Sequence, residues 1–323
     1  MEYSLIIKPY WGRSSAVVGG LVWISLFSLQ IGDSHETGLI QRIVLLGILV
    51  IVPLGLSLVP GANSEERNAK LYRLALLAQP FGAIAALASF LLPPGVPAAA
   101  LASLWFVVTA VIALLGLSRL SELELRSPAE ISISAGLIYV SVAGSWLIIS
   151  RLGIQILGYG DTIILLTAVH FHFAAYAAPI LAGLAGRNLI EEGNCNRAFR
   201  LVSLGIIAGT PLVAAGITFS PVIALVGTVM ISVSLVILSV LVVGWILPSI
   251  PSVPSRILLL ISSASTLPAM VLACAYAYSI VFQTLIIDIP QMAMTHGLIT
   301  AFGFALCGLV AWALIHRRSR ITD

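Results

Sequence analysis

Long apolar runs alternate with short polar segments along the whole chain. Ten runs reach the roughly 17–25 mostly apolar residues that a membrane-spanning helix requires. They cover residues 15–31, 41–59, 71–92, 96–117, 131–149, 162–185, 201–219, 222–247, 257–282 and 292–316. The pattern predicts an all-α fold, a polytopic transmembrane helical bundle of about ten spans. We treat residues 1–323 as a single integral membrane domain, in which the first run is a retained span and not a cleaved signal peptide.

The composition excludes the soluble classes of protein. Of the 323 residues, 59% are hydrophobic and only 9% are charged, and the mean hydropathy is +1.09. Soluble domains carry about 25% charged residues. A soluble enzyme, a nucleic-acid-binding protein and a disordered chain are therefore excluded, and the net charge of +3 is too small to indicate a nucleic-acid partner.

The basic residues predict the orientation of the bundle. With ten spans and a cytoplasmic N-terminus, the outer segments hold only Arg42 and Arg151 of the 16 lysines and arginines. The inner segments hold Lys8, Arg13, Arg67, Lys70, Arg73, Arg119, Arg126, Arg187, Arg197, Arg200, Arg256, Arg317, Arg318 and Arg320. This bias follows the positive-inside rule, so both termini are expected to be cytoplasmic. The acids among these inner arginines, including Glu130, are expected to lie in solvated loops or interfacial helices.

Three histidines lie inside or near the predicted spans. Ionisable groups are costly in lipid and therefore indicate functional sites. The sixth span enters from the outer side near Asp161, which places His170 and His172 about 13–17 Å further along the helix. His296 lies near the outer entrance of the tenth span. We predict that these three histidines and Asp161 form a shared catalytic site.

The spacing of His170 and His172 limits what the pair can do. Residues two apart on a helix point about 160° away from each other. The two rings are therefore expected to serve different neighbours, which weakens the interpretation of the pair as a metal clamp. No metal or other cofactor is expected, although a histidine-bound iron or zinc is an open variant. Asp161 has a second interpretation, as a cap of the helix that follows it.

Other polar and aromatic residues are expected to line an outer-half cavity built mainly from the sixth, ninth and tenth spans. The candidate substrate-binding residues are Trp146, Thr167, Phe173, Tyr176, Tyr276, Tyr278 and Thr300. Aromatic side chains near helix ends also serve as interface anchors, which is the alternative interpretation of the tyrosines and of Trp146.

Two short motifs carry a resemblance to a known family. The run LLTAVHFHFA (residues 165–174) and the run Thr295–Gly297 resemble the YndJ-like integral membrane family, and the proline-containing run at 45–55 looks like an early helix of that family. The resemblance extends from the second span to the tenth. The chain differs from the family pattern at Ala175 and Thr300, where Gly and Asn are expected. The resemblance implies the topology and the choice of histidines, and it brings a loose transporter description without a reaction.

Histidine titrates near neutral pH, which suits proton donation and removal. We therefore favour a multi-pass cell-membrane enzyme that performs acid–base isomerisation or cyclisation of an isoprenoid- or lipid-like substrate. A transporter or proton-coupled carrier is the alternative, since prolines interrupt several spans at positions 53, 80, 179, 211 and 268. A sensor or assembly protein is the third possibility. The expected partner is a membrane lipid or a hydrophobic small molecule.

Overall fold

A computed structural model describes residues 10–28, 36–59, 66–122, 127–191 and 196–322. Its elements are α1 (Tyr10–Ser28), α2 (Glu36–Leu46), η1 (Gly47–Ile51), α3 (Val52–Leu56), α4 (Glu66–Ser89), α5 (Val96–Glu122), α6 (Pro128–Leu152), α7 (Asp161–His172), η2 (Phe173–Ala177), α8 (Ala178–Glu191), α9 (Asn196–Phe219), α10 (Pro221–Leu241), η3 (Val242–Ile246), η4 (Leu247–Ser249), α11 (Val253–Phe282), α12 (Ile289–Met292), η5 (Ala293–Gly297), η6 (Ile299–Leu306) and α13 (Cys307–Thr322).

Several of these elements join into continuous membrane-length helices. Within the described ranges, nine helical runs are long and apolar enough to cross a membrane. The helix α1, with 19 residues including Arg13, is a tenth long helix. The prediction of an all-α, polytopic helical bundle is therefore confirmed.

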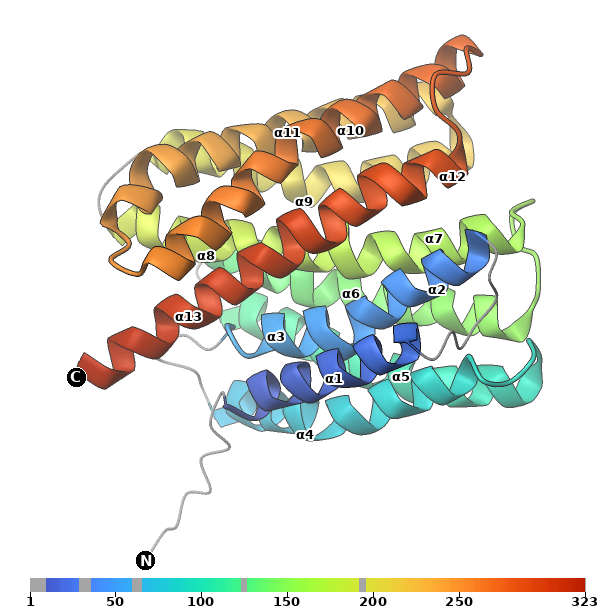
Figure 1. The fold of residues 1–323 in the computed structure, drawn as a ribbon, viewed down its shortest axis with the longest axis horizontal. Coiled ribbons are helices and arrows are strands. Elements are labelled where there is room, and N and C mark those ends of the chain that lie inside the picture. The colour runs from blue at the N-terminus through green and yellow to red at the C-terminus, as the bar shows by residue number, and fades with distance from the viewer. Residues whose placement is uncertain (1–9, 29–35, 60–65, 123–126, 192–195, 323) are drawn as a thin grey trace, which may run out of the picture.

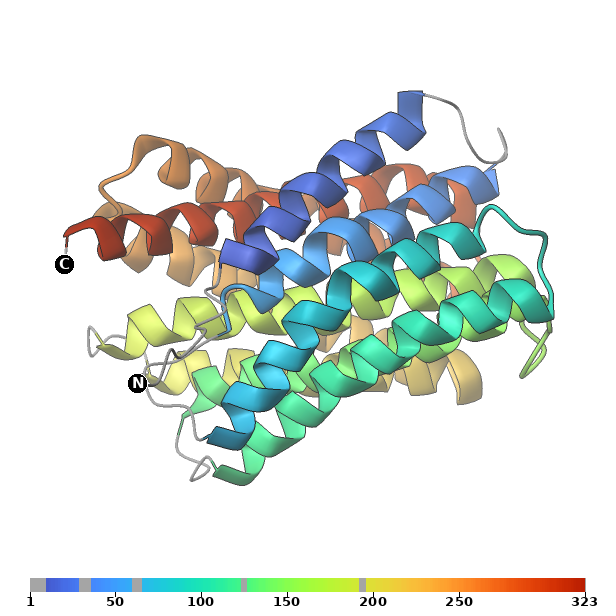
Figure 2. The same ribbon diagram turned by 90° about the horizontal axis from the view of Figure 1, so that it is seen from below.

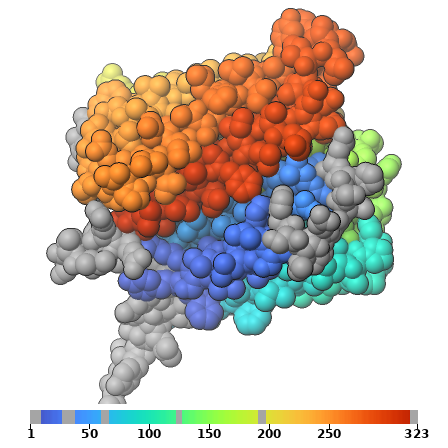
Figure 3. Space-filling view, viewed as in Figure 1, coloured from blue at the N-terminus to red at the C-terminus, as the bar shows by residue number. Residues whose placement is uncertain are grey.

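Successive long helices run in opposite directions, so α1 begins and α13 ends at the same end of the bundle (Figure 1). We call the opposite end the outer end. The helices α1–α8 form one group, α9–α11 pack beside it, and α13 crosses between the two (Figures 1 and 3). From below, α4 and α5 lie side by side along one face (Figure 2). The run Gly38–Leu56 is the most enclosed, with 83% of its apolar window buried against 22% for Val253–Phe282.

Three spans contain a five-residue π-helical turn that a proline follows. The turns are η1 with Pro53, η2 with Pro179 and η3 with Pro248. In each, the N–H of the residue before the proline bonds to the first carbonyl of the turn, five residues back. Proline has no N–H and its ring displaces a carbonyl of the preceding turn. The second carbonyl of each turn, at Ile48, Ala174 and Val243, is therefore left without a backbone donor.

Side chains of neighbouring helices replace some of the missing donors, as lipid-embedded backbone requires. Gln79 Nε2 on α4 donates to Ile48 O at 3.2 Å, and its Oε1 accepts from the hydroxyl of Ser15 on α1. Pro211 lies inside the continuous helix α9 and also lacks an N–H, and Tyr139 Oη donates at 3.0 Å to Ile207 O, the carbonyl four residues before that proline. The carbonyls of Ile48 and Ile207 are thus hydrogen-bonded across helices at 3.2 Å or less.

Gly19 sets how closely α1 approaches the π-helical turn η1. A Cβ added at Gly19 would lie 2.1 Å from Leu49 O, whereas one at Gly20 would meet only Val50 Cγ2, at 4.0 Å. We expect Gly19→Ala to destabilise the protein by ~1–3 kcal/mol, because backbone must move to relieve the overlap. Denaturation in mixed micelles, with Gly20→Ala as the matched control, measures the difference. Equal stability of the two variants would show that α1 does not pack closely here.

Arg151, one of the two arginines predicted at the outer end, binds the turn between α4 and α5. Its side chain is buried, donates from Nη2 to Leu92 O at 2.8 Å and lies over the ring of Phe90 at 4.8 Å. The carbonyl of Arg151 accepts from Gly95 N at 2.8 Å. This exception to the positive-inside bias therefore fastens the α4–α5 hairpin to the end of α6.

Candidate functional site

The structure separates the two histidines of α7. His172 is fully buried and packs against span two. A Cβ added at Gly47 would lie 2.9 Å from the Cβ of His172. Its Nδ1 donates to Ala168 O at 2.8 Å, and its Nε2 accepts from Trp105 Nε1 at 3.2 Å. Both ring nitrogens are occupied by hydrogen bonds inside the protein. His172 is therefore placed to hold α5, α7 and the π-helical turn η1 together.

His170 lies on the other side of the same helix and is exposed. Its Nδ1 lies 2.7 Å from Leu166 O. Because a carbonyl can only accept, Nδ1 carries the proton and Nε2 of the neutral ring presents a lone pair. No described residue forms a hydrogen bond with that Nε2. His170 thus offers an accessible base about 13 Å from the start of α7.

His296 presents the same chemistry from the tenth span. It lies in the π-helical turn η5, is half-buried, and donates from Nδ1 to Ala269 O on α11 at 2.8 Å. Its Nε2 also has no hydrogen-bond partner among the described residues. His296 lies close enough to His170 for the two to interact electrostatically. The structure therefore places two of the three predicted histidines within electrostatic range of each other.

Thr300 and Thr167 lie on the same two helices as this histidine pair. Thr300 Oγ1 is buried and has no hydrogen-bond partner within the described part of the chain. Thr167 Oγ1 donates to Ile163 O in its own helix at 2.8 Å. Of the two, only the Thr300 hydroxyl is uncommitted.

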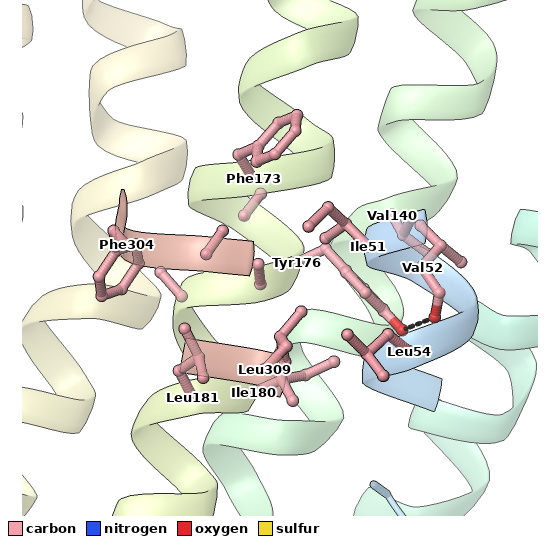
Figure 4. Packing of buried hydrophobic residues seen from close by; sticks show 14 of the residues in the cluster. Ile51, Val52, Leu54, Val140, Phe173, Tyr176, Ile180, Leu181, Phe304 and Leu309 are labelled. Atoms are coloured by element: carbon pink, nitrogen blue, oxygen red, sulfur yellow. Dashed lines mark hydrogen bonds between the residues drawn. The ribbon is translucent and has the colours of Figure 1, made fainter. Parts of the chain in front are cut away.

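Two predicted substrate-binding residues belong to the packed core. Tyr176 is fully buried, and its hydroxyl donates to Val52 O at 2.7 Å (Figure 4). A Cβ added at Gly55 would lie 2.9 Å from the Tyr176 hydroxyl oxygen, so the glycine makes room for this bond. Phe173 is 3% exposed and lies in the same hydrophobic cluster (Figure 4). These two rings join span six to span two.

The remaining predicted residues are distributed over the outer half. Asp161 is the first residue of α7 and is exposed, and the N-cap position belongs to Gly160, without a side-chain cap. Trp146 is half-buried and packs on Tyr159 with ring centroids 6.3 Å apart. Tyr276 is half-buried, whereas Tyr278 is exposed and stacks on Phe282 at 4.3 Å. Asp161 therefore faces solvent or headgroups at the first turn of α7, where its charge complements the helix dipole.

Comparison with known proteins is consistent with this architecture. A family described as YndJ-like protein matches residues 42–304. The chain belongs to the YndJ-like family. It is 27% identical over 305 residues to the uncharacterized membrane protein YndJ of Bacillus subtilis (strain 168). The matched region covers 94% of this chain and 53% of that protein. The chain thus spans about half the length of this curated relative, and no solved structure matches it.

The metal-ligand chemistry of the YndJ-like chain is sparse. Over the described ranges, no group of three or more His, Cys, Asp or Glu side chains is arranged to hold a metal ion. Within the described part of the chain, the pair of imidazoles therefore has no third ligand of this kind.

Sequence reasoning missed two features of this YndJ-like fold. The first is the carbonyl of Ala174, one turn after His170. This carbonyl has no backbone donor, because of the π-helical turn η2 and Pro179. The Thr210 hydroxyl lies 3.5 Å from it but closer, at 3.2 Å, to Ile206 O. Pro179, nine residues beyond His170, was the available signal, but only the structure shows where the register breaks.

The second missed feature is an ion cluster at the inner end of the bundle. Glu130, expected in a solvated loop or interfacial helix, is in the first turn of α6, and its side chain is only 19% exposed. It pairs with Arg119 Nη2 at 2.5 Å and with Arg187 Nε at 2.6 Å. Arg187 also donates to Val59 O at 3.0 Å. The solvated placement is wrong for Glu130, because two arginines from α5 and α8 compensate its burial.

Proposed function

We propose that this YndJ-like protein is a multi-pass cell-membrane enzyme that isomerises an isoprenoid- or lipid-like molecule by moving a proton. The observation that carries the proposal is the pairing of His170 and His296. Each ring is oriented by an Nδ1–H bond to a backbone carbonyl, and each leaves Nε2 unoccupied. An imidazole is a base in its neutral form and an acid in its protonated form, so one ring can act as a base while the other acts as an acid.

The reaction requires only the removal of one proton from the substrate and the addition of one proton to it. The neutral Nε2 of one histidine removes a proton from a substrate carbon, and the Nε2–H of the other, in its imidazolium form, protonates a different carbon. A double bond shifts between them and the composition of the molecule is unchanged. Return of a proton from the first ring to the second then restores the starting state.

The positions of the aromatic residues favour isomerisation over cyclisation. Stabilising a carbocation through a cyclisation needs aromatic faces turned toward the substrate. Phe173 and Tyr176 are instead buried in the core, and Tyr278 stacks on Phe282 at the surface. A single proton shift between two bases needs no such aromatic lining.

Deuterium incorporation tests the proposal directly. The purified protein in nanodiscs is incubated in D₂O with the lipid extract of its host membrane, and the lipids are separated by chromatography and mass spectrometry. We expect a new species with the composition of its precursor and at least one added deuteron, absent with a His170→Gln/His296→Gln double variant. If the lipid profiles with wild type and double variant are identical, the enzyme proposal is wrong.

A carrier is the second candidate, and the three π-helical turns followed by proline support it. Interrupted helices near the middle of the membrane form binding sites in many transporters. Proteoliposomes with an imposed pH gradient distinguish the two functions. A carrier moves a hydrophobic probe between leaflets without changing its structure, whereas an isomerase changes it without a gradient.

A further inference from the structure

Three polar groups at or next to the histidine pair are hydrogen-bond acceptors, and the Thr300 hydroxyl beside them can donate or accept. His170 and His296 are both held as Nδ1–H tautomers, so each Nε2 accepts. Ala174 O, one turn along from His170, has lost its backbone donor to the π-helical turn η2. Its nearest hydroxyl, on Thr210, can donate only one proton and lies closer to Ile206 O. A ligand that satisfies these three acceptors must bring a donor.

The charges around the site decide which kind of donor fits. The carboxylates at the outer starts of these two spans do not stand beside the pair. Asp161 is exposed about 13 Å away at the start of α7, and Asp288 caps α12 through Gln291 N, eight residues before His296. Arg151 at the outer end is buried, donates to Leu92 O and lies over Phe90, so it is turned away from an anionic headgroup at the surface. An ammonium would place a second positive charge beside the imidazolium that the proposed mechanism requires, whereas a hydroxyl group needs only a hydrogen bond.

We propose that the site binds a hydrophobic alcohol, with the hydroxyl donating to Ala174 O or to Nε2 of His170 and the apolar body in the membrane. This inference rests on the proposed function for the location of the site, and it adds the substrate class. A hydroxyl can also accept from the imidazolium form of either ring, so the same group stays hydrogen-bonded as the protonation of the pair changes.

Competition among ligands that differ only in their head group tests this substrate class. A diazirine-bearing hexadecanol is cross-linked to the full-length protein in nanodiscs, and the labelled peptides are sequenced. We expect labelling on α7–η2 and η5. We expect unlabelled hexadecanol to displace the probe at about tenfold lower concentration than hexadecyl methyl ether, which has no donor and leaves the buried acceptors unsatisfied. Hexadecylamine is expected to compete no better than the ether.

Two histidine variants give the test its control. His170→Phe keeps an aromatic ring but removes an acceptor, and we expect it to reduce the tenfold preference for alcohol to threefold or less. His316→Phe is matched, because His316 makes the same Nδ1 bond to a carbonyl four residues back, Trp312 O, at the inner end of the last span. That variant should retain the full preference.

The outcomes separate this inference from the proposed function. Equal competition by alcohol and ether, labelling outside α7–η2 and η5, or stronger competition by the amine would overturn the alcohol assignment. Selective binding of the alcohol without any deuterium incorporation would instead leave the assignment standing and contradict the isomerase proposal.

Discussion

Replacing His170 by glutamine is expected to slow deuterium incorporation into the substrate by about 10²–10⁴-fold, the usual contribution of a general acid or base. Glutamine approximates the size and polarity of histidine but does not titrate near neutral pH. The His170 side chain is exposed and contributes one hydrogen bond within its own helix, so the fold should tolerate the change. The initial rate of deuterium incorporation, measured beside the thermal stability of the same sample, separates catalysis from folding.

Two other histidines provide the contrast for this prediction. His316→Gln, at the inner end of the last span, should leave the rate unchanged. His172→Gln should lower thermal stability, because it breaks the bonds that a fully buried ring makes with Trp105 and Ala168. If His170→Gln retained the wild-type rate while folding normally, a catalytic role for this residue would be excluded.

The divergence of His170 and His172 shows what spacing alone can predict. Two residues apart on a helix must face different neighbours, and in the structure one ring meets Trp105 while the other is exposed and lies near His296. Spacing could not reveal which ring is engaged by hydrogen bonds, because Trp105 is 67 residues away in sequence. A buried imidazole and an accessible one have the same sequence signature.

The spans themselves were predictable because apolar length is a local property. The π-helical turns were not, since Pro53 and Pro179 could equally have kinked a regular helix. Their geometry depends on donors from other helices, such as Gln79 for Ile48 O. The same holds for Glu130: a glutamate flanked by arginines in a short polar segment indicates solvent unless the partners on distant helices are known.

Glu130→Ala is expected to destabilise the protein by about 3 kcal/mol, because removing one partner of a largely buried ion cluster leaves the others uncompensated. The side chains of Arg119 and Arg187 are only 10% and 18% exposed, and both depend on this carboxylate. Arg187 also holds the last carbonyls of span two, at Leu58 and Val59. Loss of Glu130 should therefore loosen the inner ends of α3, α5, α6 and α8 together.

Chemical denaturation in mixed micelles measures this effect, with Glu66→Ala as the matched control. Glu66 pairs with Lys70 in the same helix, but their side chains are 82% and 72% exposed, so this ion pair should contribute nothing measurable. The stability of Glu130→Gln should lie between those of Glu130→Ala and Glu66→Ala, because the amide oxygen still accepts from one arginine while the charge is lost. If Glu130→Ala were as stable as Glu66→Ala, the inner cluster would be solvated, as the sequence pattern alone indicates, and the two arginines would find water instead of the carboxylate.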